Sequence, residues 1–265
     1  MRIISLDDHT LINQTTMSND VIFEDEQGNR ITREDLAYVT KGHVDFALIG
    51  REQIPFEAIE LHQKARQEGQ QYGNYDKAIE LLKKTCLMAD HWPYPVYDLA
   101  FTYLLQKNYE QALQYYRLTD ELEPRGFFTA KTAIYALEGE LDGRFPPGLY
   151  LAYLKIEWTD NEQEKLEIAS SIVQKCPDFA PAWKELAILH DDSTQRMKAI
   201  ATGLAQNPDA ETEGNLLINK ALVLDKEGKT KEAIGILGNL ILNSNVTLAN
   251  DAMSRFVLNQ IINRS

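Results

Sequence analysis

A phrase that recurs after 34 residues limits most strongly what this chain can fold into. Residues 73–82 read GNYDKAIELL and residues 107–116 read KNYEQALQYY, so an Asn-Tyr pair, an acid and an alanine occupy the same places in both. Further along, Ala187 and Ala221 are also 34 residues apart. A fixed period of this length is typical of stacked helix pairs, in which each pair buries its apolar face against its neighbours. The sequence therefore predicts an all-α repeat protein.

The segment 93–126 carries the period in its most complete form. Apolar residues recur there at spacings of three and four, as on one face of a helix. Small side chains at Ala100 and Ala112 allow two helices to approach closely, and larger side chains fill the space around them. Along its whole length this segment resembles a tetratricopeptide repeat, and the residues that carry the resemblance are Leu99, Ala100, Tyr103, Asn108, Tyr109, Ala112, Tyr116, Thr119 and Pro124.

The resemblance extends with uneven quality over roughly residues 56–262. It implies a TPR-like α-α superhelix, a right-handed solenoid of antiparallel helix pairs. The unit that begins near Leu61 departs from the family pattern, because Arg66 stands where a small residue is preferred.

Two domains are expected. Residues 1–50 contain short β-branched runs and turn residues and predict a small α+β N-terminal segment. Residues 51–265 form the helical repeat domain, with a mid-chain irregularity near 127–148, where the helix 127–140 lacks a clear partner before the sequence RFPPG at 144–148. A helix over 247–262 is expected to cap the last pair.

The amino-acid composition limits the classes of partner that the chain can bind. The net charge is −13, from 40 acidic and 27 basic residues, which argues against nucleic acid and against an anionic membrane, since both are held by clustered Lys and Arg. No apolar run approaches the roughly 20 residues that span a bilayer, and the N-terminus lacks the apolar core of a signal peptide. Cys86 and Cys176 fit no zinc or disulfide pattern. A cytoplasmic protein with two reduced thiols is expected.

No arrangement of residues that predicts catalysis is present. The five histidines lack metal-ligand spacing, and the chain contains neither a Gly-rich phosphate loop nor a nucleophile elbow. We therefore expect no enzyme, no cofactor and no metal. The alternative is an enzyme whose site lies in the N-terminal segment or at the irregular stretch 144–148.

A binding surface is the remaining expectation. In tetratricopeptide repeats the first helix of each pair lines a concave groove, and the residues of that helix that are not needed against its own partner face inward. Aromatic residues at such positions are typical of contact sites, although individual rings can instead pack on the next repeat. The predicted groove residues are Tyr94, Tyr97, Phe101, Leu104, Phe128, Lys131, Tyr135, Lys184, Ile188, Ile218 and Leu222.

The first functional hypothesis is an adaptor or scaffold that holds a protein or peptide segment in this groove. A self-assembling subunit, for example a homodimer, and a repeat chaperone that shields apolar segments are the alternatives. Repeat proteins that bind the acidic tails of heat-shock chaperones use a clamp of Lys, Arg and Asn. Here Asp98 would repel a carboxylate and only Lys131 matches, so that clamp is absent.

Overall fold

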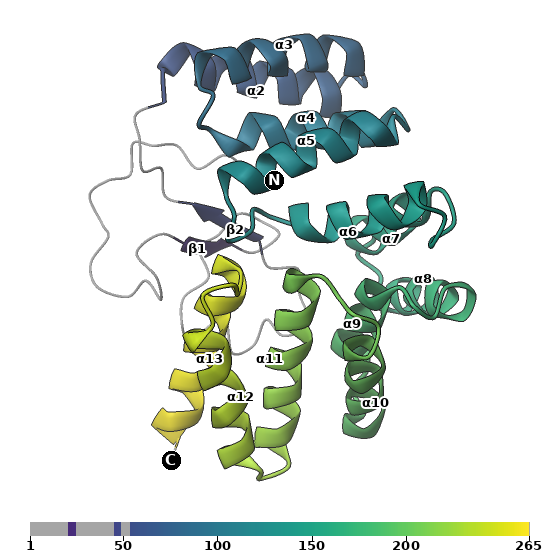
Figure 1. The fold of residues 1–265 in the computed structure, drawn as a ribbon, viewed down its shortest axis with the longest axis vertical. Helices are drawn as coiled ribbons and strands as arrows, with labels where there is room; N and C mark the ends of the chain where they lie inside the picture. Colours follow the sequence, from purple (N-terminus) through teal and green to yellow (C-terminus); the bar gives the residue numbers. More distant parts are fainter. Residues whose placement is uncertain (1–20, 25–44, 49–53, 265) are drawn as a thin grey trace. The chain divides into compact units, whose positions relative to one another are not determined.

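The computed structural model describes residues 21–24, 45–48 and 54–264 (Figure 1). Two strands, β1 (Val21–Glu24) and β2 (Asp45–Leu48), pair antiparallel, with Val21 opposite Leu48. The rest of the predicted segment 1–50 lies outside the described residues. The helices are α2 (Phe56–Gln70), α3 (Tyr75–Met88), α4 (Pro93–Leu105), α5 (Tyr109–Leu122), α6 (Ala130–Leu141), α7 (Leu149–Trp158), α8 (Glu162–Lys175), α9 (Ala180–Leu189), α10 (Ser193–Leu204), α11 (Ala210–Lys226), α12 (Thr230–Leu242) and α13 (Leu248–Arg264).

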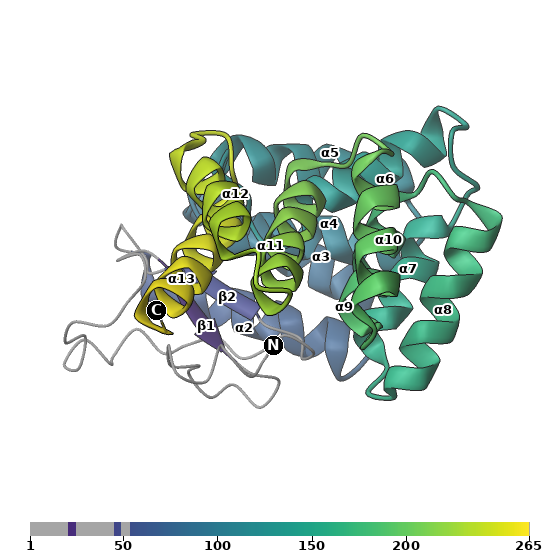
Figure 2. The same cartoon turned by 90° about the horizontal axis from the view of Figure 1, so that it is seen from below.

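The chain divides into two compact units. Residues 51–179 form one unit with α2 to α8, and residues 180–265 form the other with α9 to α13, together with residues 1–50. In the first unit α2 packs on α3, α4 on α5 and α7 on α8, while α3–α4 and α5–α6 contacts join successive pairs (Figure 1). In the second unit α9 packs on α10, α11 on α12 and α13 on both α11 and α12 (Figure 2). The predicted all-α class, built from helix pairs, is confirmed.

The 34-residue period has a direct backbone counterpart at the turns. Gly73 and Lys107, which are equivalent in the period, both take a positive φ, of 63° and 60°. The next residues, Asn74 and Asn108, are the N-caps of α3 and α5, and their side chains accept hydrogen bonds from the backbone N–H three residues on. An asparagine N-cap satisfies a donor that the helix leaves open. The recurring letters therefore specify a recurring turn.

The helix crossings confirm the packing role of the small residues. Ala78 and Ala112, equivalent in α3 and α5, are both buried, and so is Ala100 in α4. Thr85 and Thr119 are also equivalent, and each buried hydroxyl donates to the carbonyl four residues earlier. Each threonine therefore buries its hydroxyl at no hydrogen-bonding cost.

The irregular stretch after α6 is a capping structure. The chain turns at Gly143, and Phe145 folds back against Gly139, to whose carbonyl its own N–H donates over 2.7 Å. The buried carboxylate of Glu140 then accepts hydrogen bonds from the backbone N–H groups of Gly148, at 2.6 Å, and Tyr150, at 2.7 Å. Glu140 thus satisfies the first turn of α7 from the end of the preceding helix, which gives 144–148 a structural role.

The second unit is held together by aliphatic packing and close backbone approach. A core from α11, α12 and α13 includes Leu224, Leu237 and Phe256. Gly214 in α11 leaves room for the amide of Asn250 in α13, which donates to the carbonyls of Ala210 and Glu211 at 3.3 and 3.0 Å. A side chain at position 214 would overlap that amide.

Candidate functional site: the inner face of α4

The predicted stripe on α4 is divided in the structure. Tyr94, Tyr97 and Phe101 are half-buried, but Leu104 is 0% exposed. A fully buried side chain offers no surface to a partner, so the assignment of Leu104 to the groove is corrected. The helical spacing did place it near the stripe, but the helix turns this position into the core.

The two tyrosines pack against the start of α6. The ring of Phe127 lies 4.8 Å from Tyr94 and 5.7 Å from Tyr97, and the ring of Phe128 lies 5.6 and 5.2 Å from the same two rings. Phe128 has a φ of 47°, a conformation that bulky residues rarely adopt. The four rings therefore hold the α4–α6 junction, and Tyr94, Tyr97 and Phe128 also keep some exposed surface, whereas Phe127 is fully buried.

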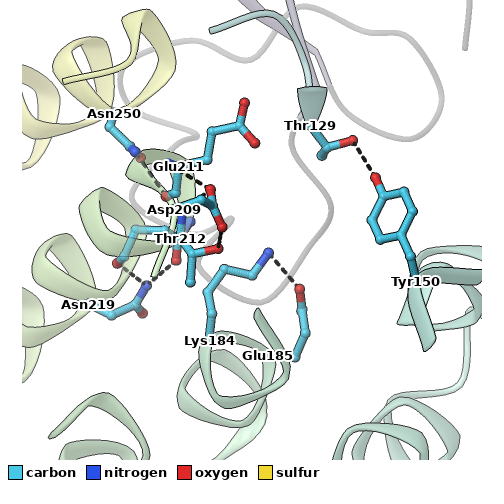
Figure 3. Close-up of polar contacts among 10 residues, drawn as sticks. Thr129, Tyr150, Lys184, Glu185, Asp209, Glu211, Thr212, Asn219 and Asn250 are labelled. Carbon is cyan, nitrogen blue, oxygen red and sulfur yellow. Dashed lines mark hydrogen bonds and ion pairs between the residues drawn. The ribbon is translucent and has the colours of Figure 1, made fainter. Parts of the chain in front are cut away.

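A chain of hydroxyl groups runs beneath these rings. The Tyr97 hydroxyl lies 2.9 Å from Oγ1 of Thr129. The same Oγ1 lies 3.4 Å from the hydroxyl of Tyr150 on α7 (Figure 3). The rings of Tyr97 and Tyr150 both contact Tyr116 on α5. Burial raises the pKa of Tyr116 and of Tyr150 well above the ordinary value for a phenol. Both phenols consequently stay neutral and join α4, α5 and α7.

The predicted residues of α6 are engaged within the first unit. The ammonium group of Lys131, which is half-buried, lies 2.6 Å from a carboxylate oxygen of Asp120 on α5. Tyr135 receives the guanidinium of Arg144 over its ring at 5.1 Å, and its hydroxyl donates to the carbonyl of Asp178 at 3.3 Å. Both side chains remain partly exposed.

The predicted residues of the second unit are less uniform. Lys184 forms an ion pair with Glu185 at 2.7 Å (Figure 3), and Ile188 and Leu222 are half-buried. Ile218 is 4% exposed and belongs to the core of α11 to α13, so its assignment to the groove is also corrected. Two polar side chains of this unit form hydrogen bonds within α11 and at its start. Asp209 caps the helix, and the amide of Asn219 donates to Asn215 (Figure 3).

A residue that the prediction omitted extends the surface of α4. Trp158, the last residue of α7, is 52% exposed, and its ring centre lies 6.4 Å from that of Phe101 in an edge-to-face arrangement. The sequence did hold a signal. Apolar residues surround the whole circumference of residues 149–158, so such a helix must be covered on all sides or present an apolar surface.

Helices α4 and α7 each carry one carboxylate, Asp98 and Glu157. Asp98 accepts from Nε2 of the buried His62 at 2.8 Å and lies 3.5 Å from Nε of Arg66. Arg66, which departs from the family pattern, is therefore used to join α2 to α4. Glu157 lies close enough to Tyr116 and Tyr150 to add, after burial, to the rise in their pKa values.

Thiol and metal chemistry give no candidate site among the described residues. Burial raises the pKa of Cys86 to about 11 and that of Cys176 to about 12, so both free thiols stay protonated and unreactive near neutral pH. In the described part of the chain, His, Cys, Asp and Glu side chains form no group that could hold a metal ion. None of the described helices combines the length and apolarity needed to cross a bilayer.

Comparison with known protein families supports the predicted helical repeat. Residues 96–124 match the sequence profile of the tetratricopeptide repeat, which confirms the resemblance at that segment. No curated protein sequence matches the chain.

Among solved structures, the chain is similar to the flexible tandem repeat domain of a bacterial cellulose synthase component, with 17% identity, 73% of this chain and 96% of the other covered, and a TM-score of 0.46. It is also similar to MamA from Desulfovibrio magneticus RS-1, with 15% identity, 71% and 94% covered, and a TM-score of 0.33. A third is TTC0263, a thermophilic TPR protein of Thermus thermophilus, with 14% identity, 77% and 98% covered, and a TM-score of 0.33.

Proposed function

We propose that this protein is a protein-interaction scaffold that holds a segment of a partner on the inner face of α4, beside the end of α7. The observation that carries the proposal is Trp158, a large aromatic side chain that is half-exposed and rests on Phe101 of the matched repeat. Exposed aromatic residues supply much of the binding energy at protein interfaces.

The surroundings of Trp158 support a preformed surface. Phe101 contacts its ring, and the neighbouring Tyr97 is fixed by its hydrogen bond to Thr129 and by ring contacts to Tyr116 and Phe127. A partner that binds side chains held in this way loses little conformational entropy in ordering them.

The test begins with the selection of random dodecapeptides against the full chain and measurement of the affinity of the tightest synthetic peptide by calorimetry. A Phe101→Ala, Trp158→Ala double variant should weaken that affinity at least about tenfold, because two aromatic contacts are lost. Circular dichroism checks that the variant keeps its helical content.

The matched control is a Tyr72→Ala, Leu87→Ala variant, which removes two exposed apolar side chains of the same unit from α2–α3. Its affinity should equal that of the wild type. Failure to enrich any peptide, or an equal loss in both variants, contradicts the proposal.

The finer parts of the sequence-based hypothesis remain predictions. The nine predicted groove residues that keep exposed surface are expected to contribute to binding, with Phe101 foremost. Self-assembly is tested by light scattering of the full chain, where a monomer at all concentrations excludes it. A cytoplasmic location is tested by fractionation of cells that express the protein.

A further inference from the structure

We propose that a cavity between α5 and the end of α6 binds a short extended segment of a partner protein, in which one apolar side chain is flanked on both sides by a lysine or arginine. The cavity shares no lining residue with the surface at Phe101 and Trp158, so this inference does not depend on the proposed function.

The cavity follows one face of α5. Its lining residues on that helix recur at spacings of three and four, which places them on the same side, and the last residue of α6 completes the wall. The cavity has a volume of about 370 Å³, which accommodates a large aliphatic side chain. It is lined by Glu110, Leu113, Gln114, Arg117, Glu121 and Leu141.

The apolar part of the lining comes from two leucines. Leu113 is buried, whereas Leu141 is 48% exposed, because α6 ends at this residue and no further turn of the helix covers it. Removal of such apolar surface from water is favourable. An apolar side chain of a partner is therefore the group that fits between these leucines.

Two carboxylates determine which charges can flank that side chain. Glu110 and Glu121 are exposed, and within the described part of the chain their side chains form no hydrogen bond or ion pair. Arg117, the one basic residue of the lining, is already paired with Glu138 at 2.7 Å. The cavity consequently attracts basic side chains and repels acidic ones.

The preceding repeat shows why Glu110 lacks a partner. Asp76 holds the equivalent place on α3 and accepts a hydrogen bond from Nε2 of Gln106 at 2.8 Å. The equivalent of Gln106, 34 residues on, is Glu140, whose carboxylate has no N–H to donate and is bonded to backbone N–H groups at the start of α7. The capping structure after α6 therefore takes away the donor that Glu110 would otherwise have.

The two helices also differ in their basic residues. On α3, Glu80 is paired with Lys77 and Lys84, each at 2.7 Å. The equivalents of these lysines on α5 are Gln111 and Leu118, so α5 brings no ammonium group to its own carboxylates. Basic side chains of a partner can take that place.

The length of the cavity sets the spacing of the basic residues. Glu110 and Glu121 are separated by three turns of α5, or about 16 Å along its axis at a rise of about 1.5 Å per residue. An extended segment covers this distance in about five residues. Because an exposed ion pair contributes little by itself, recognition requires the central apolar side chain as well as the two charges.

The experiment uses three synthetic peptides labelled with fluorescein. Each has a central leucine in a background of serine and glycine, with two flanking lysines that are four, five or six positions apart. Fluorescence anisotropy measures their affinity for the full chain. The tightest should lose at least about tenfold in affinity when the leucine is replaced by serine, and as much when both lysines are replaced by glutamine.

Variants of the protein connect this binding to the cavity. Glu110→Gln with Glu121→Gln should reduce the affinity for the lysine peptide to that for the glutamine peptide, and leave the latter unchanged, which a loss of folding would not do. The matched control is Glu57→Gln with Glu60→Gln, which removes two exposed carboxylates from α2 and should keep the full affinity. Trp158→Ala should keep it as well.

Three outcomes overturn the inference. They are the absence of binding by all three peptides, an equal loss in the two double variants, which shows attraction to overall charge, and a loss in Trp158→Ala, which places the peptide on the other surface. None of them contradicts the proposed function, which is tested by the selected dodecapeptide and the Phe101→Ala, Trp158→Ala variant.

Discussion

The two compact units solve the same packing problem with different side chains. Residues 51–179 hold 19 of the 24 Phe, Tyr and Trp residues of the chain, whereas residues 180–265 hold only Trp183 and Phe256. In the first unit ring contacts connect α4, α5, α6 and α7. In the second unit aliphatic side chains fill the core, and glycines such as Gly214 allow close approach.

This difference indicates where binding can arise. Large rings that join helices also reach the surface, as Tyr97 and Phe101 do, so under the proposed function one residue would serve both packing and binding. Small residues allow helices to approach closely, but they expose little side-chain surface for a partner to contact. The aromatic unit is therefore the better candidate for the proposed recognition of a partner.

The largest expected effect follows from removing a ring of the α4–α6 junction. Phe127→Ala should lower the free energy of unfolding by about 3–5 kcal/mol, because the buried ring contacts Tyr94, Tyr97 and Phe128. Urea denaturation followed by circular dichroism measures it. The exposed Phe56 provides the control, since Phe56→Ala should change stability by less than about 0.5 kcal/mol.

Leu237→Ala tests the aliphatic side of the comparison and should cost about 2–5 kcal/mol. A loss below about 1 kcal/mol would contradict the conclusion that aliphatic side chains such as Leu237 hold the second unit together.

Glycine substitutions sharpen the description of the second unit. Gly214→Ala should destabilise the protein by about 1–3 kcal/mol, because the new methyl group overlaps the Asn250 amide. Gly235→Ala, in the interior of α12 with open space around it, should instead stabilise by about 0.5–1 kcal/mol. Thermal melting of the two variants compares them, and shifts of the same sign would contradict the close approach.

Glu140 tests the capping structure after α6. Glu140→Gln should cost about 1 kcal/mol, because an amide oxygen replaces only part of a carboxylate that accepts two N–H bonds. Burial raises the pKa of Glu140 from its ordinary value of 4.5 despite these bonds, so the folded state binds the proton more tightly than the unfolded chain does.

Wild-type stability should therefore fall as the pH rises from about 4.5 through the raised pKa of Glu140, and the difference between the wild type and the Gln variant should shrink over that range. Urea denaturation at a series of pH values measures the difference. A difference that grows with pH would contradict the direction of the shift.

The smallest effect concerns a single hydroxyl in the aromatic unit. The hydroxyl of Tyr116 is buried and has no hydrogen-bond partner among the described residues, so Tyr116→Phe should leave stability unchanged or raise it by up to about 1 kcal/mol. Tyr150→Phe is the matched control, since its hydroxyl lies 3.4 Å from Thr129, and it should lose about 0.5 kcal/mol. If Tyr116→Phe melted at a lower temperature than Tyr150→Phe, the hydroxyl of Tyr116 would have a hydrogen-bond partner in solution.

The sequence predicted the helix pairs well because their signals are local. The cap at Asn108, the small residue at Ala112 and the apolar face of α4 all act within one repeat. The helix 248–264 falls close to the predicted range 247–262 for the same reason.

The surface was predicted less well because exposure depends on neighbouring helices. Leu104 and Ile218 share the spacing of surface residues, yet both are buried by contacts that no local pattern records. Trp158 was missed because the period breaks after α6, so the register could not be carried forward to α7. The sequence did not predict the cap formed by Glu140 either. Its carboxylate bonds to residues eight and ten positions further on, Gly148 and Tyr150, and these separations do not correspond to the spacing along one helix.

The φ of 47° at Phe128 places two opposed demands on one position. Glycine or asparagine would suit the backbone, but neither would fill the space beside Tyr94 and Phe127 that the phenyl ring occupies. Exchange at this position is thus tolerable only together with compensating changes in its neighbours. The junction before α6 is expected to change as a block during evolution, with the residues of the loop and of α4 varying in concert.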